Sequence, residues 1–112
     1  MSKKFEKHGF NVYCRDYISN REFDIILRQL REMKVDLSTG LDQDKLLELL
    51  SSINKAVESF VIKVEKDEKI IEKDIDELPA SVMFSAKMYL FECFKSFAED
   101  IEPNEVDESK KV

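Results

Sequence analysis

The amino-acid sequence predicts a mainly α-helical fold, with three long helices in a small bundle and a short N-terminal strand or two-stranded element beside them. Apolar residues recur at steps of three and four over three long segments, which is the spacing of one face of a helix. A helix-capping sequence begins at Ser19. The 112 residues include only two glycines, which leaves little material for the tight turns of an all-β fold.

The first helix has the clearest start signal in the chain. Residues 19–22 fit a capping box, in which the Ser19 hydroxyl accepts from the amide of Glu22 and the Glu22 carboxylate accepts from the amide of Ser19. Ile18 and Phe23 flank this box as a hydrophobic staple. Helical spacing then continues to about residue 34 through Phe23, Ile26, Leu27, Leu30 and Met33.

A second helix is expected from Asp42 to Val64. Acidic residues in its first turns suit the positive end of the helix dipole. Its apolar stripe runs without interruption over about five turns and consists of Leu46, Leu49, Leu50, Ile53, Val57, Phe60, Val61 and Val64. The following stretch, 65–78, is mostly charged, and its composition fits a loop, a short strand or a short helix equally well.

A third helix is expected to begin at Pro79 and to run to Asp100. Proline suits the first helical position, because its missing N–H would have no partner there in any case. One core stripe covers about 140° of the circumference and contains Val82, Met83, Ala86, Tyr89, Leu90, Cys93, Phe94, Phe97 and Ile101.

A second apolar patch on the third helix is formed by Phe84, Met88, Phe91 and Ala98. It widens the apolar arc to roughly 260°, which is more than a helix with two neighbours buries. In one interpretation, Phe84, Met88 and Phe91 stay exposed as a groove for a partner helix or as a self-association face, since Met and Phe make adaptable contacts of large area. In the other, the patch is covered by the aromatic side chains of the N-terminal segment, Phe5, Phe10, Tyr13 and Tyr17.

The folded domain is expected to span residues 10–101. Residues 1–9 read as a charged leader, and residues 102–112 as an acidic disordered tail, because both stretches are polar and terminal. Residues 10–14 alternate apolar and polar side chains like a short strand. The isoleucine pair at 70–71 is the best candidate for its partner strand.

The charge and the cysteine content restrict the partners and the compartment. The net charge is −6, and an acidic balance opposes direct binding to DNA or RNA, because phosphate contacts need a cationic surface. Apolar runs fall short of the ~20 residues of a membrane span, so no membrane contact is expected. Two cysteines, Cys14 and Cys93, are too few for a secreted disulfide scaffold, which favours the cytoplasm, or the host cytoplasm if the protein is viral.

The sequence contains no motif that specifies a reaction, and we expect a protein that is not an enzyme and that holds neither cofactor nor metal. His8 is the only histidine and lies in the charged leader, where nothing would bury it as a catalytic base. Cys93 lies in the predicted core stripe, where a thiol serves as a small hydrophobe. Glu48, Glu58 and Glu92 offer carboxylates for a metal, but no Glu-x-x-His step accompanies them.

Several features follow one another in a recognisable order: the short segment Phe10-Asn11-Val12, the capped helix ISNREFDIILRQL, a long Leu-rich helix, a charged stretch ending DIDELP and the apolar helix VMFSAKMYLFECFKSF. Over residues 10–101 this order resembles the small tail assembly chaperones of long-tailed bacteriophages. In that family an acidic, largely helical protein binds the tape-measure protein. It keeps the hydrophobic helices of that protein soluble until the tail tube polymerises around it.

The resemblance and the second apolar patch together predict a non-catalytic protein-protein interaction module. It would act as an assembly chaperone or adaptor that shields the apolar helices of a tape-measure-like partner through Phe84, Met88 and Phe91. The alternative is an acidic inhibitor or decoy that occupies a basic groove of a nucleic-acid enzyme, because complementary charge speeds association. A third function is that of a subunit in a homo-oligomer.

Overall fold

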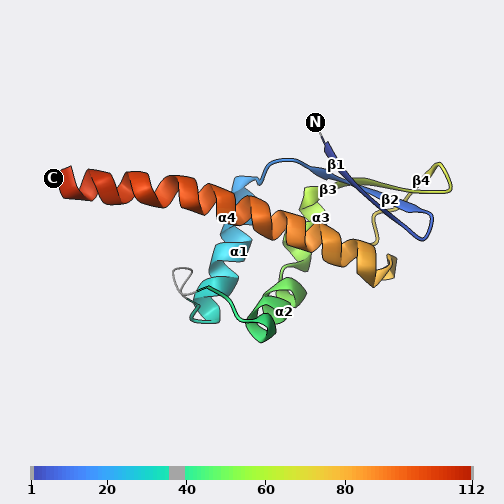
Figure 1. Ribbon diagram of the computed structural model, residues 1–112. Helices are drawn as coiled ribbons and strands as arrows, with labels where there is room; N and C mark the ends of the chain where they lie inside the picture. Colours follow the sequence, from blue (N-terminus) through green and yellow to red (C-terminus); the bar gives the residue numbers. More distant parts are fainter. Residues whose placement is uncertain (1, 36–39, 112) are drawn as a thin grey trace.

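The computed structural model describes the backbone of residues 2–35 and 40–111 and the side chains of residues 2–35 and 40–98. Over these residues the chain forms an α+β fold of four α-helices, one short 3-10 helix and a four-stranded antiparallel sheet (Figure 1). In chain order the elements are β1 (Ser2–Lys7), β2 (Phe10–Arg15), α1 (Asn20–Glu32), α2 (Gln43–Ser52), α3 (Asn54–Phe60), β3 (Val61–Lys66), β4 (Lys69–Ile71), η1 (Ile75–Glu77) and α4 (Ala80–Lys111). The prediction of a mainly α-helical bundle of three long helices is therefore wrong.

The sheet has the strand order β1-β2-β3-β4. One row of apolar side chains crosses all four strands, because Phe5 pairs with Val12, Val12 pairs with Val64, and Val64 pairs with Ile71. Val12 and Val64 are fully buried, whereas the two residues on the edge strands are half-buried. This row packs against the helices, so that the sheet and the helices share one hydrophobic core.

The predicted helix over residues 42–64 is three elements in the structure, α2, α3 and β3. Two serines end α2, and their hydroxyls donate to backbone carbonyls of the preceding turn. Such side-chain bonds compete with the regular helical ladder. Ile53, at φ −106° and ψ 24°, then separates α2 from α3.

A β-bulge gives β3 the spacing of buried residues that is typical of a helix. The register between β2 and β3 shifts between Tyr13 and Cys14, which leaves Ile62 as an extra residue on β3. The buried side chains of β3, Val61 and Val64, are consequently three positions apart instead of two. Because a step of three also fits a helix, the apolar stripe of the helix seemed to continue through the strand.

The charged stretch 65–78 contains the end of β3, the strand β4 and the 3-10 helix η1. The isoleucine pair at 70–71 does form a strand, but it pairs with β3. β2 lies between β1 and β3. The predicted pairing of residues 10–14 with residues 70–71 is therefore wrong, because the bulged β3 separates them.

The two ends of the chain contain more regular structure than the sequence predicts. Ser2–Lys7, within the predicted leader 1–9, form the edge strand β1, which pairs with β2 along its whole length. At the other end, the backbone of α4 continues through Pro103 to Lys111. It thus covers most of the predicted tail 102–112, whose side chains lie outside the described residues. A proline inside a helix removes one backbone hydrogen bond, and α4 continues past that loss.

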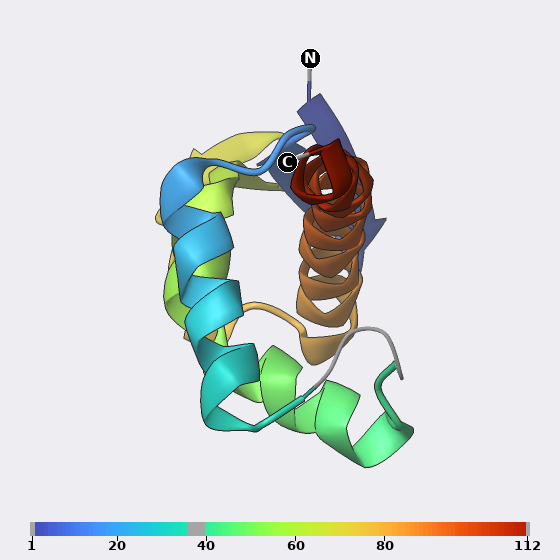
Figure 2. The same cartoon turned by 90° about the vertical axis from the view of Figure 1, so that its left-hand side faces the viewer.

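The long helix α4 runs along one side of the molecule. Its first half packs beside the sheet and the other helices, and its second half projects beyond them (Figure 1). A view nearly along its axis shows α1 and α3 beside it on the left and α2 below it (Figure 2). The contact with α1 is aromatic: Phe23 stacks on Phe94 and meets Phe97 edge-on, each with ring centroids 5.0 Å apart.

Two tight turns close the two hairpins at the same end of the sheet. His8 and Gly9 have φ values of 55° and 81°, and Asp67 and Glu68 have φ values of 52° and 70°. Positive φ at both central residues is the signature of the two-residue turns whose twist matches that of a hairpin. The amide of Asp67 donates to the carbonyl of Gly9 at 3.3 Å, so the two turns support each other.

Replacing Glu68 by glycine is expected to stabilise the protein. A left-handed backbone conformation costs a residue with a side chain about 1 kcal/mol, whereas glycine adopts it freely. Glu68→Gly should raise the free energy of unfolding by about 0.5 kcal/mol, measured by urea denaturation. As a control, Ile70→Gly in the neighbouring strand should lower it by about 1 kcal/mol. A loss of stability in Glu68→Gly would contradict the turn geometry described here.

Candidate functional site

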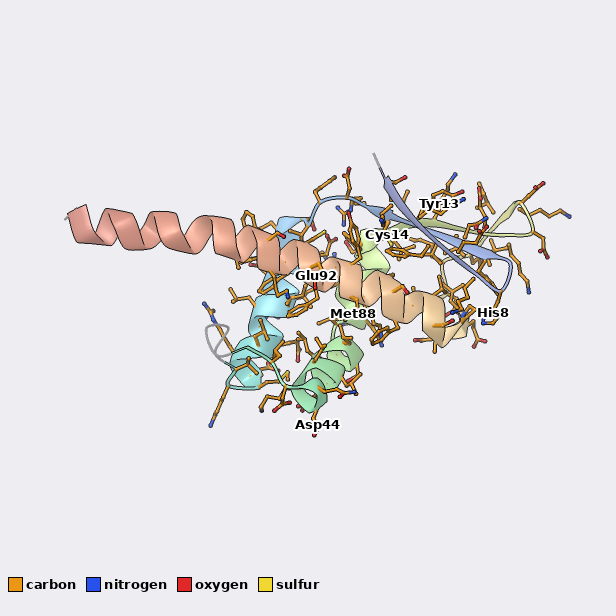
Figure 3. The ribbon with its side chains drawn as sticks, in the orientation of Figure 1. His8, Tyr13, Cys14, Asp44, Met88 and Glu92 are labelled. Carbon is orange, nitrogen blue, oxygen red and sulfur yellow. The ribbon has the colours of Figure 1, made fainter. Side chains whose placement is uncertain are left out.

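The three residues predicted to bind a partner lie in different environments. Phe84 is 47% exposed, Met88 is half-buried and Phe91 is only 4% exposed. All three lie on the packed half of α4, where Figure 3 marks Met88. Only Phe84 presents a large apolar surface to solvent.

Phe84 lines an open groove of about 360 Å³ between α2, η1 and the first turns of α4, called the α2–α4 groove below. Leu47 of α2, which is 48% exposed, lines the same groove. Further apolar lining comes from Leu50, Ile75, Leu78 and Met83, and charged lining comes from Asp76 and Lys87. Two large, half-exposed apolar side chains from different helices therefore meet at one hollow.

Leu47 is the groove residue that the sequence did not reveal. The leucines at 46, 49 and 50 fall on the predicted apolar stripe of the helix, and Leu47 falls off it. Its place outside the core stripe is the only signal in the sequence, and single exposed leucines are too common for that signal to mark a site. Leu47 matters because it lines the same groove as Phe84. No spacing in the sequence indicates that these two residues lie close together.

Phe91 belongs to the hydrophobic core. Its ring stacks on that of Phe94, with centroids 6.1 Å apart and planes 11° apart, and the Lys95 ammonium lies 5.5 Å from the ring centroid. The predicted exposed patch therefore does not include Phe91. The reason is that α4 packs against the sheet as well as against helices, and so buries a wider arc than a helix with two neighbours.

The aromatic side chains of the N-terminal segment do not cover Phe84. Phe5 meets Tyr89 edge-on, with centroids 5.8 Å apart, on another side of α4. Tyr13 donates to the Glu65 carboxylate at 3.0 Å, and the Tyr17 ring is 59% exposed. The interpretation in which this segment shields the second apolar patch is therefore wrong for Phe84.

Glu22 is the one charged residue that is fully buried among the described residues. Its carboxylate accepts hydrogen bonds from the Arg15 guanidinium, from the Ser59 hydroxyl and, at 2.9 Å, from the backbone amide of Ser19. Arg15 also donates to the backbone carbonyl of Ser59 at 3.1 Å. The predicted capping box is confirmed, and it is part of a larger cluster that joins β2, α1 and α3.

The cluster keeps Glu22 ionised. Burial raises the pKa of a carboxyl group, because it penalises the charged form. Here the hydrogen bonds from Ser59 and Ser19 and the charge of Arg15 outweigh burial, so that the pKa of Glu22 lies below its ordinary value. Its oxygens are occupied and closed off from solvent, which makes Glu22 a structural group.

The histidine and the cysteines lie apart from the groove. His8 is exposed in the hairpin turn at one end of the sheet, away from Cys14 (Figure 3). Burial, followed by the nearby Cys93, raises the pKa of the Cys14 thiol to about 12. Burial also raises the pKa of Cys93. Both thiols therefore favour the protonated form at neutral pH, in which a thiol is a poor nucleophile.

The acidic side chains considered as metal ligands do not gather. Glu48, Glu58 and Glu92 are exposed on three different helices, α2, α3 and α4. Across residues 2–35 and the described part after residue 40, no three His, Cys, Asp or Glu side chains are placed to hold a metal ion. Within the same residues, no helix combines the length and the apolar character that crossing a lipid bilayer requires.

Comparisons with protein-family models, with curated proteins and with solved structures find no match for this chain. The resemblance to phage tail assembly chaperones therefore stays a prediction from the sequence.

Replacing Glu22 should destabilise the protein in a pH-dependent way. Glu22→Gln leaves Arg15 without its anionic partner, which should lower the free energy of unfolding by about 2–3 kcal/mol at pH 7. Because the pKa of Glu22 is lower in the folded state, its stabilisation is complete above the ordinary value of about 4.3 and is lost as the pH falls through the folded value.

Urea denaturation at a series of pH values from 7 down to 3 tests this expectation. The difference between the wild type and Glu22→Gln should shrink as the solution becomes acidic. Glu48→Gln, a matched change of an exposed glutamate on α2, should alter stability by less than about 0.5 kcal/mol at every pH. A difference for Glu22→Gln that stays constant over this range would show that its charge does not stabilise the fold.

Proposed function

We propose that this protein is a non-catalytic interaction module that holds an apolar helical segment of a partner protein in the α2–α4 groove. One observation carries the proposal: Leu47 and Phe84, from two helices, line one groove, and each is about half exposed. Exposed apolar side chains that gather at one concave place are typical of interaction sites, whereas single exposed ones are common everywhere.

The shape of the groove suits a helix as the occupant. Its lining on α4 comes from Ala80, Met83, Phe84 and Lys87, which follow one side of the helix for about 10 Å at 1.5 Å per residue. A partner helix that lies along this side presents apolar side chains at steps of three, four and seven residues. Met83, an almost fully buried residue of the lining, has an unbranched side chain, which suits contact with side chains of different shapes.

Two charged side chains of the lining add polar contacts to this apolar groove. Asp76 and Lys87 line it with opposite charges. Burial lowers the pKa of the Lys87 ammonium, while the neighbouring Asp76 carboxylate acts in the opposite direction. A partner helix with polar residues beside its apolar stripe would satisfy these two groups, as polar contacts commonly do in interfaces.

An assembly chaperone or adaptor is the form of interaction module that we favour. The net charge of −6 keeps a complex with an apolar partner dispersed through charge repulsion. The resemblance to tail assembly chaperones makes a tape-measure-like helical protein the natural partner. The thiols of Cys14 and Cys93 are both free, which supports the cytoplasm as the compartment, or the host cytoplasm for a viral protein.

Removing either exposed side chain of the groove should weaken the binding of a helical peptide. A suitable probe is a fluorescent synthetic helix with leucine at steps of three and four and glutamine elsewhere. Full burial of a Leu or Phe side chain is worth about 1.5–3 kcal/mol, and binding would bury the exposed half of each. Leu47→Ser and Phe84→Ser should therefore each raise Kd about three- to tenfold in anisotropy titrations. Ile70→Ser, which removes an even more exposed apolar side chain outside the groove, should leave Kd unchanged.

Three results would overturn the proposal. Unchanged Kd in both groove variants would exclude the groove as the site. Binding that weakens steeply between low and high salt would favour the acidic inhibitor instead, because apolar contacts tolerate salt. Concentration-dependent dimerisation that Phe84→Ser abolishes in sedimentation experiments would make a second copy of this chain the occupant.

A further inference from the structure

A second hollow on the surface is rich in positive charge. It is an open pocket of about 420 Å³ between the start of α1, the helix α3 and the segment after β4. It shares no lining residue with the α2–α4 groove. Its lining consists of Arg21, Lys55, Glu58, Ser59 and Lys73, and we call it the cationic pocket. Three cations against one carboxylate is an unusual balance for a protein whose net charge is −6.

The protein balances the three cations only in part, through the one carboxylate of the lining, Glu58. Within the part of the chain that the structure describes, Arg21, Lys55 and Lys73 form no salt bridge. The Lys73 ammonium is oriented by two backbone carbonyls, donating to Glu58 at 3.3 Å and to Val61 at 2.9 Å. Neutral carbonyls fix the position of the ammonium but leave its charge uncompensated. Like charges gathered at one hollow repel one another, and a bound anion would relieve this repulsion.

The buried carboxylate nearby does not cancel this positive potential. Glu22 accepts from the hydroxyl of Ser59, which lines the cationic pocket. Its charge is already compensated by Arg15, which is not part of the pocket lining. The first turn of α1, which carries Arg21, adds the positive end of the helix dipole.

We propose that the cationic pocket binds a phosphate-class dianion through Arg21, Lys55 and Lys73. A dianion balances the excess of two positive charges in the lining, whereas a single carboxylate would balance half of it. The guanidinium of Arg21 presents paired donors that match two phosphate oxygens, and the two ammonium groups act as mobile point charges. Because the pocket is open, the phosphate is either free or carried on a phosphorylated side chain of a partner.

Titration of inorganic phosphate into the full-length protein tests the pocket. In ¹⁵N-labelled protein at pH 7 and low salt, the amide signals of residues 21, 55 and 73 should shift and saturate, and acetate at equal ionic strength should not shift them. Lys55→Gln and Lys73→Gln should each raise Kd roughly fivefold, which is the effect of losing one exposed charge contact. Lys45→Gln, an exposed lysine on α2 outside the pocket, should change nothing.

The neighbouring carboxylate supplies a test in the opposite direction. Glu58→Gln removes the only negative charge of the lining and should lower Kd for phosphate roughly fivefold. Unlike Lys73→Gln, this variant keeps the Lys73 ammonium and the backbone carbonyls to which it donates. Weaker or equal binding in Glu58→Gln would overturn the proposal.

A second experiment distinguishes a free phosphate from a phosphorylated side chain of a partner. A short phosphoserine peptide that binds more tightly than inorganic phosphate, while its unphosphorylated form does not bind, points to a phosphorylated partner. Equal affinity for the peptide and for phosphate points to the free ion. An absence of saturable shifts with both ligands would overturn the proposal. Phe84→Ser should leave phosphate binding unchanged, so a failure here is distinguishable from a failure of the α2–α4 groove.

Discussion

The arrangement of the sheet against the helices depends on one buried charge, the carboxylate of Glu22. A carboxylate that is removed from water without partners costs several kcal/mol. Here the donors come from three elements: Arg15 at the end of β2, Ser19 before α1 and Ser59 in α3. A displacement of any of these elements would leave a buried charge incompletely paired. The cluster therefore restricts how β2, α1 and α3 pack, which apolar contacts alone do less specifically.

The same cluster is connected to the aromatic core. The guanidinium of Arg15 lies 5.9 Å from the ring centroid of Phe60 and 5.2 Å from that of Tyr17, so cation-π contacts add to its ion pair. Phe60 in turn lies 5.9 Å from the ring of Tyr89 on α4. A path of direct contacts thus runs from the buried carboxylate through α3 to the long helix. Together with the contacts of Phe23 with Phe94 and Phe97, this path connects α4 to the rest of the core.

The features that the sequence could predict are those that act over a few residues. The capping box at Ser19 is an interaction across three positions, and the start of the last helix after Pro79 depends on the local chemistry of proline. β3 was not predictable in this way, because its bulge at Ile62 produces a helical step of three. β1 was not predictable either, because its pairing with β2 decides its structure more than its lysine-rich composition does. The hairpin turns, His8-Gly9 and Asp67-Glu68, lack the Asn-Gly and Asp-Gly pairs that announce such turns.

In the candidate site, too, local features could be predicted from the sequence, and contacts between distant residues could not. The excess of apolar surface on α4 could be read from the sequence, and Phe84 is indeed exposed. How much of that surface is buried depends on the number of neighbours, and the sheet that buries part of α4 was not foreseen. Each hollow is lined by residues that are far apart in the chain: Phe84 and Leu47 line the α2–α4 groove, and Arg21 and Lys73 line the cationic pocket. Only the tertiary fold brings such residues to one hollow.

The start of α3 brings the two proposed binding surfaces close together, since Asn54 lines the α2–α4 groove and the next residue, Lys55, lines the cationic pocket. This helix is only seven residues long, and its N-terminus has no side-chain cap, two features that favour its displacement by a bound ligand. Against that, one face of the helix is buried in the core, and Ser59 is held by the buried carboxylate of Glu22. A ligand can transmit an effect only by favouring a second arrangement of the element between the sites. Because any other arrangement of α3 would unpair that carboxylate, we expect an apolar partner and a phosphate to bind without affecting each other.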